Sequence, residues 1–396
     1  MSLFLEIKEL YPKTIEIRRK LHQNPEIAFE EVMTSALVAD ELTKLGFQVR
    51  TQVGKTGVVG LIEGANDSPV IMLRFDMDAL LVTEENEVEY KSANTGKMHA
   101  CGHDAHVAIG LTIAAWLSAH QKDLDATFKL VFQPAEEIRM GAAAMIRDGI
   151  LENPKPNYAL GVHIWNDKPY GWMGISDGPI MAGSADIDIE IIGRGGHGAI
   201  PELTLDPILA SAHVVTALQS IVSRNISPRD KGALSITYVR AGSAGNIIPP
   251  NIQMKGTIRT FEKSVSQKII ERTKQITENV ATGLGCRAVV KINEATPPLV
   301  NDPVIAGLAR KAARLINPDA EIQEDYQTMS SEDIALFLDK IPGAFIFVGS
   351  ADEEAGKNYP QHHPRFDIDE RSMIIAAAVL LETCHEIIAY HRGKAG

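Results

Sequence analysis

Apolar residues in the first part of the chain alternate between two spacings. Helical spacing predicts helices over about 7–22 and 29–45, which stop at Asn24-Pro25 and Gly46. Short β-rich runs follow, and those that are apolar throughout are typical of strands covered on both faces of a parallel sheet. The strands predicted from these runs are Val58–Ile62, Val70–Leu73, Phe128–Phe132 and Ala159–Ile164.

Further helices are predicted between these strands, at about 106–120 and 141–150. Strand and helix patterns therefore alternate, which indicates a doubly wound α/β domain with a mixed sheet. In such a domain, the loops at the carboxyl ends of the strands build the site. Asp76, Glu136-Glu137 and His163 lie at or just past such strand ends, so we expect them to face one site.

The pattern changes near Ser184. Residues 185–192 alternate between polar and apolar side chains, as a half-exposed antiparallel strand does. The whole segment reads βαββαβ, the split arrangement of ferredoxin-like domains. Its later elements are predicted at about 206–225 (helix), 234–239 (strand), 252–259 (strand), 263–282 (helix) and 288–292 (strand).

Alternating α/β patterning returns after Thr296-Pro-Pro298. At 396 residues, two domains are the natural expectation. The simplest organisation is a catalytic domain, residues 1–183 and 297–396, interrupted by an inserted domain, residues 184–296. The last elements are predicted at about 303–315 (helix), 331–338 (helix), 344–348 (strand) and from 369 (helix).

Composition narrows the classes of partner and location. The net charge of −12 argues against nucleic acid or an anionic membrane as a partner. Three cysteines, Cys101, Cys286 and Cys384, are too few and too scattered for a disulfide framework. The N-terminus turns charged before a signal-length apolar run develops, and no apolar stretch approaches the length needed to span a bilayer. We therefore expect a cytoplasmic protein.

The segment Met98–His106 contains three histidines, one cysteine and one aspartate. Such groups are costly to bury unpaired, but they become inexpensive together if they share a cation. A thiolate at Cys101 and an imidazole at His103 suit Zn²⁺, Mn²⁺ or Ni²⁺ better than Mg²⁺ or Ca²⁺. Two ligands cannot complete a coordination sphere, so further ligands must come from elsewhere in the chain.

Several other residues are candidates, each with a structural alternative. Glu136-Glu137 follows a strand directly, so that one carboxylate can bind metal while the other faces substrate; alternatively, the pair is a solvated acidic loop. His163 ends an apolar strand and is either a ligand or a hydrogen-bonded core histidine. The pair His362-His363 is either a surface loop or a ligand site. Asp76 either orients a ligand or forms a turn with Arg74.

The glycine-rich segment Gly193–Gly198 lies in the inserted domain. It lacks the Lys-Ser/Thr ending of a phosphate loop and the full dinucleotide spacing, so we reject a phosphate-binding interpretation. A histidine on a flexible glycine loop, here His197, can instead reach another domain or subunit.

Taken together, the motifs resemble those of the aminoacylase/carboxypeptidase family of di-metal amidohydrolases over essentially the full length of the chain. The most similar branch contains hippurate hydrolases, plant auxin-conjugate hydrolases and N-acetyl-diaminopimelate deacetylases. The segments that carry the resemblance are Leu21–Glu26, Arg74–Leu80, His99–His106, Phe132–Glu137, Gly161–His163, Gly195–Gly198 and His362-His-Pro364.

The resemblance implies two divalent metal ions and a role for each matching residue. Glu136 would be the general base, taking a proton from the attacking water and passing it to the leaving amine. His197 of the inserted domain, from a neighbouring subunit, would stabilise the oxyanion. Asn246 and Arg259 are similar to positions that contact the substrate carboxylate. The implied metal ligands are Cys101 (bridging both ions), His103, Glu137, His163 and His362.

Two features of this chain depart from the wider family. That family usually has His-x-Asp where this chain has Arg74-Phe-Asp76, and a bridging aspartate where this chain has Cys101. The metal is therefore left open among Mn, Zn, Ni and Co. The ligand lies two residues before the proline in the family motif, which selects His362 over His363.

The function implied is hydrolysis of the amide bond of N-acyl or N-aroyl amino acids, such as hippurate. An N-acetyl-diaminopimelate-type deacetylase is the first alternative. A metal-free amidase with Cys101 as a thiol nucleophile is a second, and a binding protein without activity is a third. The inserted domain is expected to act as a lid and to make a homodimer or a higher homo-oligomer.

Overall fold

The computed structural model describes residues 2–66 and 68–395. The chain divides into two compact units, and the first comprises Met1–Gly178, Val300–Gln327 and Asp333–Gly396. The second comprises Pro179–Leu299 together with the short segment Thr328–Glu332, which no sequence pattern singles out.

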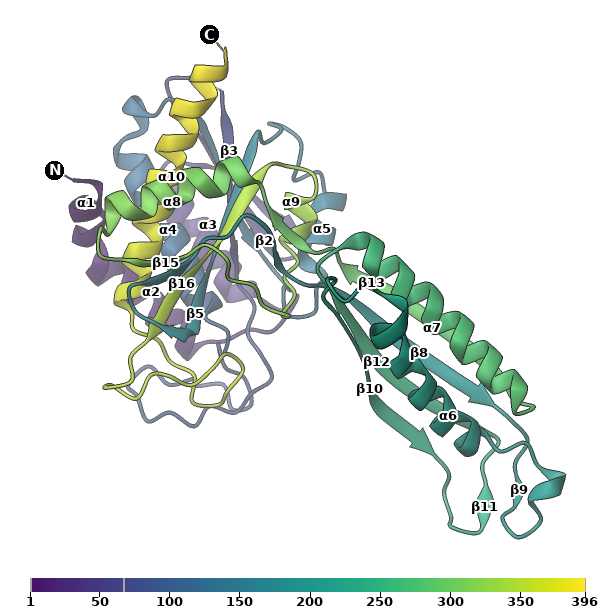
Figure 1. The fold of residues 1–396 in the computed structure, drawn as a ribbon. Coiled ribbons are helices and arrows are strands. Elements are labelled where there is room, and N and C mark those ends of the chain that lie inside the picture. Colours follow the sequence, from purple (N-terminus) through teal and green to yellow (C-terminus); the bar gives the residue numbers. More distant parts are fainter. Residues whose placement is uncertain (1, 67, 396) are drawn as a thin grey trace. The chain divides into compact units, whose positions relative to one another are not determined.

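An eight-stranded mixed sheet forms the centre of the first unit, as the alternating pattern predicts (Figure 1). Its central strands β4, β3, β5 and β16 are parallel, while β2 and β6 pair antiparallel with β4 and β16. The order across the sheet is β1-β2-β4-β3-β5-β16-β6-β15. The bounds are β1 Gln48–Val53, β2 Gly57–Glu63, β3 Val70–Asp76, β4 Thr127–Gln133, β5 Tyr158–Pro169, β6 Trp172–Gly174, β15 Glu321–Gln323 and β16 Gly343–Ala351.

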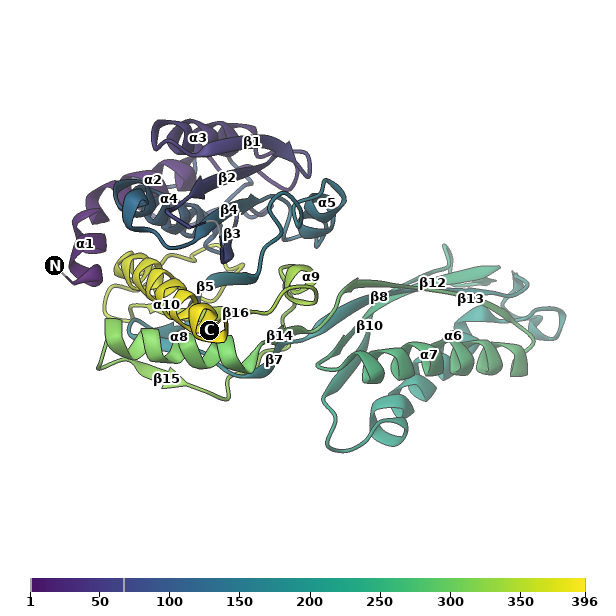
Figure 2. The same cartoon turned by 90° about the horizontal axis from the view of Figure 1, so that it is seen from above.

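Helices cover both faces of this sheet, with α4 and α10 on one face and α5 and α9 on the other (Figure 2). The helix predicted over 7–22 is divided at Leu10, and the helix predicted over 331–338 is only a short turn of helix, α9. The bounds are α1 Leu3–Glu9, α2 Tyr11–Gln23, α3 Val32–Lys44, α4 His103–Ala119, α5 Gly141–Arg147, α8 Pro303–Ile316, α9 Ala335–Leu338 and α10 Arg371–Ala395.

The C-terminal helix corrects one expectation from the sequence. Residues Arg371–Lys394 are long and apolar enough to cross a membrane by length and composition, with a mean hydropathy of 1.6. However, 78% of that window is buried inside the protein. Ala377, Val379 and Leu381 are fully or almost fully buried in the core of the first unit. Its apolar composition is thus accounted for by packing between the sheet and α8.

Strand register places the predicted site residues at one level of the sheet. Asp76 at the end of β3 is paired with Gln133 at the end of β4. Arg74 is paired with Gly161 on β5, so His163, two residues further on, stands at the level of Asp76. The carboxyl ends of these parallel strands therefore present their side chains to one edge, where α/β sheets build their sites.

The second unit is a ferredoxin-like βαββαβ domain, as its alternating strands predict. Its sheet has the order β10-β12-β8-β13, and α6 and α7 pack on it (Figure 1). Along β8, Ile187, Ile189 and Ile191 are buried while the residues between them are not, which gives this unit its own core. The bounds are β8 Gly183–Ile192, α6 Pro207–Ser220, β10 Gly232–Ala241, β12 Asn251–Thr260, α7 Lys263–Gly283 and β13 Arg287–Thr296.

Four short strands lie outside the two main sheets. A two-stranded ribbon joins β9 (Gly196–His197) to β11 (Ile247–Ile248). A second two-stranded sheet joins β7 (Gly178–Met181) to β14 (Leu299–Asn301).

Candidate metal centre

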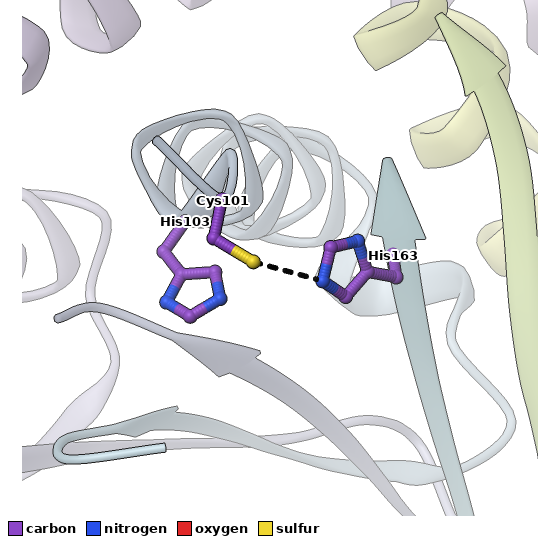
Figure 3. Close-up of side chains that lie close together, drawn as sticks. All are labelled: Cys101, His103 and His163. Atoms are coloured by element: carbon purple, nitrogen blue, oxygen red, sulfur yellow. Dashed lines mark hydrogen bonds between the residues drawn. The ribbon is translucent and has the colours of Figure 1, made fainter. Parts of the chain in front are cut away.

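Cys101 and His103 flank a sharp turn at the start of α4. Gly102 between them has φ +91°, a left-handed conformation that residues with a Cβ rarely adopt. His103 is the first residue of the helix, and the partial positive charge of a helix N-terminus favours a thiolate nearby. Figure 3 shows both side chains leaving this turn, with the Cys101 sulfur directed at His163 on β5.

Hydrogen bonds fix the two imidazole rings. His163 Nδ1 donates to the Ile164 carbonyl at 2.7 Å, and its Nε2 lies 3.5 Å from Cys101 Sγ. His103 Nδ1 donates to the Asp78 carbonyl at 2.9 Å, and its Nε2 has no hydrogen-bond partner among the described residues. Because a carbonyl only accepts, each Nδ1 carries a proton and each Nε2 can bind a cation. One ligand atom from each of Cys101, His103 and His163 lies within 4.8 Å of the other two.

Glu137 and His362 form a second such group, again with Cys101. His362 Nε2 lies 3.4 Å from Glu137 Oε2, while Glu137 Oε1 has no hydrogen-bond partner in the described part of the chain. The His362 backbone is left-handed, with φ +68°, and its N–H donates to the Ala100 carbonyl at 2.7 Å. That bond ties the His362 loop to the segment that carries Cys101. Cys101 therefore belongs to both groups.

Glu136 lies beside these ligands without belonging to either group. Its carboxylate forms a third group with His103 and Glu137, with all three ligand atoms within 4.8 Å of one another. The side chain is almost buried, with 7% exposed. The adjacent residues Glu136 and Glu137 thus both reach one centre, and the Glu136 carboxylate is placed to exchange a proton with a molecule held there.

His363, the neighbour of His362, lies in a different environment. Its ring stacks on Tyr359, with 4.5 Å between the ring centroids, and its Nδ1 accepts a hydrogen bond from the Arg365 backbone. The structure thus brings His362, and not His363, to the cluster.

The electrostatics of Cys101 and His163 depend on burial. Burial raises the pKa of the Cys101 thiol well above its ordinary value, and the carboxylates of Glu137 and Glu136 raise it further. Burial also lowers the pKa of His163 well below its ordinary value, with His106 acting in the same direction. By themselves, the two side chains are therefore a thiol and a neutral imidazole. A thiolate–imidazolium pair is disfavoured here unless a positive charge is bound nearby.

His103 shows the opposite balance. Burial acts to lower its pKa, but the carboxylates of Asp76, Asp78 and Glu137 outweigh burial and raise the pKa to about 10. The site therefore favours a positive charge at His103, and a divalent cation on Nε2 would take the place of the second ring proton.

Asp76 lies next to the cluster and contacts the side chains that surround it. Its carboxylate binds Arg74 Nη1 at 2.5 Å and His106 Nδ1, and lies 3.7 Å from His103 Nε2. Although burial opposes ionisation, Arg74 and His103 hold the pKa of Asp76 well below its usual range. His106 Nε2 accepts the backbone N–H of Ile164 at 2.9 Å, so His106 links Asp76 to the strand of His163.

Asp78 is a functional candidate that the sequence did not single out. Its two carboxylate oxygens accept the backbone N–H groups of Glu136 and Glu137, each at 3.0 Å, and its carbonyl accepts from His103. The segment Arg74–Leu80 contains this residue. However, a carboxylate that accepts hydrogen bonds from backbone N–H groups leaves no spacing signal in a sequence, because every segment supplies such donors.

The three candidate residues of the second unit, which the sequence assigned to the substrate, lie in two separate places. His197 is on β9 and Asn246 precedes β11, and the Gly198 N–H donates to the Asn246 carbonyl at 2.9 Å. Both side chains are exposed. Arg259 is half-buried near the far end of β12, where it is paired with Ser184 of β8. The structure thus brings His197 and Asn246 together, but it does not bring Arg259 to them.

The donor set fits borderline divalent cations. It contains one thiol, imidazole nitrogens and a carboxylate, the combination that favours Zn²⁺, Mn²⁺, Co²⁺ or Ni²⁺ over purely oxygen-bound ions. Two of its atoms, His103 Nε2 and Glu137 Oε1, are buried without a hydrogen-bond partner among the described residues. Such atoms are costly to bury unless an ion completes their coordination.

Comparison with known proteins identifies the family. The model of peptidase family M20/M25/M40 matches residues 72–386. The chain belongs to this family.

Relatives within the M20/M25/M40 family cover nearly the whole chain. N-acetyl-L-cysteine deacetylase of Bacillus subtilis (strain 168) is 37% identical over 384 residues, covering 97% of this chain and 90% of the relative. IAA-amino acid hydrolase ILR1-like 4 of Arabidopsis thaliana is 37% identical over 369 residues, covering 92% of this chain and 83% of the relative. The crystal structure of the Bacillus subtilis YXEP protein, described as a dinuclear metal binding peptidase of the M20 family, has a TM-score of 0.81 and 33% identity. The match covers 95% of this chain and 98% of that one.

These findings confirm the family resemblance drawn from the motifs. Relatives in the M20/M25/M40 family are hydrolases of amide bonds, as deacetylases, carboxypeptidases and amidohydrolases are. The protein is accordingly an amide hydrolase of this family.

Proposed function

We propose that this protein is a dinuclear-metal amidohydrolase that cleaves N-acyl or N-aroyl amino acids into a carboxylic acid and a free amino acid. The observation that carries the proposal is the position of Glu136 beside two ligand groups that share Cys101. The names of two relatives support the substrate class. N-acetyl-L-cysteine and an IAA-amino acid are both amides formed on the nitrogen of an amino acid.

Each ligand group would hold one cation. Cys101, His103 and His163 form the first group, and Cys101, Glu137 and His362 form the second. When bound, the two cations would lower the pKa of a water molecule and polarise the scissile carbonyl. Cys101 is the shared residue, which supports its role as the bridging ligand.

The proton transfers fall to Glu136. Its carboxylate is ionised when it accepts the proton of the attacking water, and neutral when it gives that proton to the leaving nitrogen. Because the side chain is 7% exposed, little solvent competes for the proton. The Glu136 N–H donates to the Asp78 carboxylate, and this bond fixes the backbone from which the Glu136 side chain extends.

We also propose that the active protein is a homodimer whose second unit serves the partner's site. Asn246 lies beyond the Asn251 end of β12, and Arg259 lies near the other end. The strand between Asn251 and Arg259 spans about 26 Å at about 3.3 Å per residue. One substrate carboxylate is too small to contact both residues within one chain. Two copies, one supplying Arg259 and the other Asn246 with His197, satisfy both assignments.

The edge of the second unit supports this arrangement. Strand β10 is an edge of the four-stranded sheet, and most of its side chains are exposed. Tyr238 and Val239 are 41% and 56% exposed on it. An unpaired edge with exposed apolar side chains is suited to pairing with a second copy.

The alternative of a metal-free cysteine amidase is less well supported. Such an enzyme needs a thiolate and a basic imidazole, whereas burial disfavours both in Cys101 and His163. An N-acetyl-diaminopimelate deacetylase would use the same centre and differ only in the groups that contact the substrate.

The test is activity after removal and return of metal. Protein freed of metal by a chelator is dialysed and reconstituted separately with Mn²⁺, Zn²⁺, Co²⁺ or Ni²⁺. The substrates are N-acetylcysteine, hippurate, N-acetyl-diaminopimelate and indole-acetyl amino acids. We expect no activity without metal and amino acid release with at least one ion. Activity that survives the chelator but is lost on alkylation would establish the cysteine amidase instead.

A further inference from the structure

The turn that carries Glu136 and Glu137 is held by carboxylates outside the ligand set. The Ala135 N–H donates to Glu31 Oε1 at 2.9 Å. The next two N–H groups, of Glu136 and Glu137, donate to the two oxygens of Asp78 at 3.0 Å each. Three consecutive backbone donors thus point to two side chains, both of them buried.

The first residue of this turn has an unfavourable backbone conformation. Ala135 has φ +54°, in the left-handed region, and so does Arg139, with φ +57°. A residue with a Cβ keeps such a conformation only when its surroundings impose it, and such residues cluster at functional sites. The Ala135 N–H is held by the hydrogen bond that it donates to the Glu31 carboxylate.

Glu31 is itself rigidly placed. The residue is 0% exposed, and its second oxygen accepts from Thr56 Oγ1 at 2.5 Å. It lies directly before α3, whose first turn is held by Glu26, which accepts from the backbone of Met33 and Thr34. Because Glu31 is completely buried at the start of this helix, the acceptor of the Ala135 N–H has little freedom to move even without the bond from Thr56.

We propose that Glu31 is a positioning residue for the hydrolysis, because it holds Ala135 in its left-handed conformation and thereby aims the Glu136 carboxylate. The inference rests on the proposed function, in which Glu136 transfers the proton. Glu31 acts through the backbone and belongs to none of the candidate ligand groups. Asp78 serves the same turn, but its carboxylate Oδ1 also lies 3.3 Å from Nδ1 of the ligand His103, so substitutions of Glu31 test the turn more cleanly.

The experiment compares three variants of the full-length protein. Glu31→Ala removes the acceptor of the Ala135 N–H. Glu31→Gln keeps an oxygen that can accept this bond. Thr56→Val is the matched control, because it removes the hydrogen bond to the other oxygen of the same carboxylate and leaves Ala135 untouched.

Two readouts are measured for each variant. The first is hydrogen exchange of the backbone amides of residues 134–142, followed by mass spectrometry, which requires neither metal nor substrate. The second is the pair kcat and KM of the metal-reconstituted protein, together with its Co²⁺ affinity measured by calorimetry. Thermal unfolding of each variant records any general loss of stability.

Glu31→Ala should make exchange in residues 134–142 about tenfold faster. It should lower kcat by about 10- to 100-fold with little change in KM, since a displacement of about 1 Å costs this much. Glu31→Gln should bring both the exchange rate of residues 134–142 and kcat most of the way back to those of the unaltered protein. Thr56→Val should lower the unfolding temperature while leaving exchange in this segment and kcat near those of the unaltered protein.

The proposal is overturned if Glu31→Ala leaves exchange and kcat unchanged, or if Thr56→Val lowers kcat as much as Glu31→Ala does. Failure of the proposed function gives a different result. The unaltered protein would then release no amino acid with any ion, while the exchange measurement would still report whether Glu31 holds the turn.

A second pair of variants isolates the strain at Ala135. Glycine adopts left-handed backbone at no steric cost, so Ala135→Gly removes the need for an imposed conformation. We expect the fold-decrease in kcat caused by Glu31→Ala to be smaller in the Ala135→Gly background than in the unaltered protein. Equal losses in the two backgrounds would show that Glu31 does not act through the conformation of Ala135.

Discussion

His362 Nε2 lies 3.4 Å from Glu137 Oε2, although the two residues come from loops far apart in the sequence. The next residue, His363, is turned away and stacks on Tyr359. Two adjacent histidines with the same intrinsic chemistry therefore have different surroundings, and only one of them faces the other ligands.

This difference predicts opposite results for a matched pair of variants. His362→Gln removes a ligand and should lower metal affinity by at least about 100-fold, more than the loss of an outer contact costs. Activity should fall with it. His363→Gln removes a ring that faces Tyr359 and should bind metal as the unaltered protein does. Metal content after dialysis, measured by mass spectrometry, decides the matter, and equal losses in both variants would refute the assignment of His362.

Glu136→Gln separates proton transfer from metal binding. The amide cannot accept the proton, so kcat should fall by about 100- to 10,000-fold, the range that general acid–base catalysis contributes. Metal content should not change, because Glu137 and the other ligands are intact. The measurement is kcat together with metal content, and near-normal turnover would exclude Glu136 as the base.

His197→Ala should lower kcat by about 100-fold, the value of one group that stabilises an oxyanion, without emptying the metal site. The reason is that His197 lies in the second unit, whereas the proposed metal ligands, from Cys101 to His362, lie in the first. His213→Ala is a suitable control, since His213 is an exposed histidine of the same unit. Loss of metal together with kcat would show that His197 is not a lid residue.

Mixing two inactive variants tests whether His197 acts in the partner subunit. In a mixed dimer of Glu136→Gln and His197→Ala chains, one site has Glu136 from its own chain and His197 from the partner. Equal co-expression should therefore recover about a quarter of the activity, because half of the dimers are mixed and each has one intact site. If His197 serves its own chain, no mixed dimer contains an intact site and activity stays low.

The sequence predicted the parts of the fold that have a strong pattern. Strand β3 is apolar over Val70–Leu73 and lies buried at the centre of the sheet. Strand β6 and the edge strand β15 are each three residues long, and a pattern of that length is not distinctive. The break at Leu10 went unseen because both α1 and α2 keep helical spacing across it.

The residues of the candidate site divide in a similar way. Cys101, His103 and His362 stand in motifs whose residue types announce metal binding, and the structure brings them together. Glu31 and Asp78 act on backbone N–H groups, and any local sequence supplies such donors. Their roles depend on three-dimensional proximity alone. Arg18 is similar, because a single arginine on a helix is ordinarily exposed, yet it is completely buried here.

That buried arginine gives a prediction about pH. Arg18 Nη2 donates to Asp367 Oδ1 at 2.8 Å, and the same carboxylate accepts from Tyr90 at 2.7 Å and Lys357 at 2.9 Å. Burial opposes ionisation of Asp367, but Arg18 and Lys357 outweigh it and hold the pKa far below its usual range. In the unfolded chain, the pKa returns to about 3.9. The stabilisation is therefore present above pH 4 and is lost as pH falls toward the folded value.

The test is urea unfolding of the protein and its Asp367→Asn variant between pH 7 and pH 3. At pH 7, Asp367→Asn should lower the free energy of unfolding by about 3–5 kcal/mol, because Arg18 is left buried with one partner fewer. Between pH 4 and pH 3, the unfolded chain begins to take up the proton and the stabilisation by Asp367 falls, so the difference in unfolding free energy between the two proteins should narrow. Asp40→Asn alters an exposed carboxylate paired with Lys44 and should shift neither curve. A gap between the proteins that stays constant from pH 7 to pH 3 would mean that Asp367 contributes through its shape and hydrogen bonds, and not through its charge.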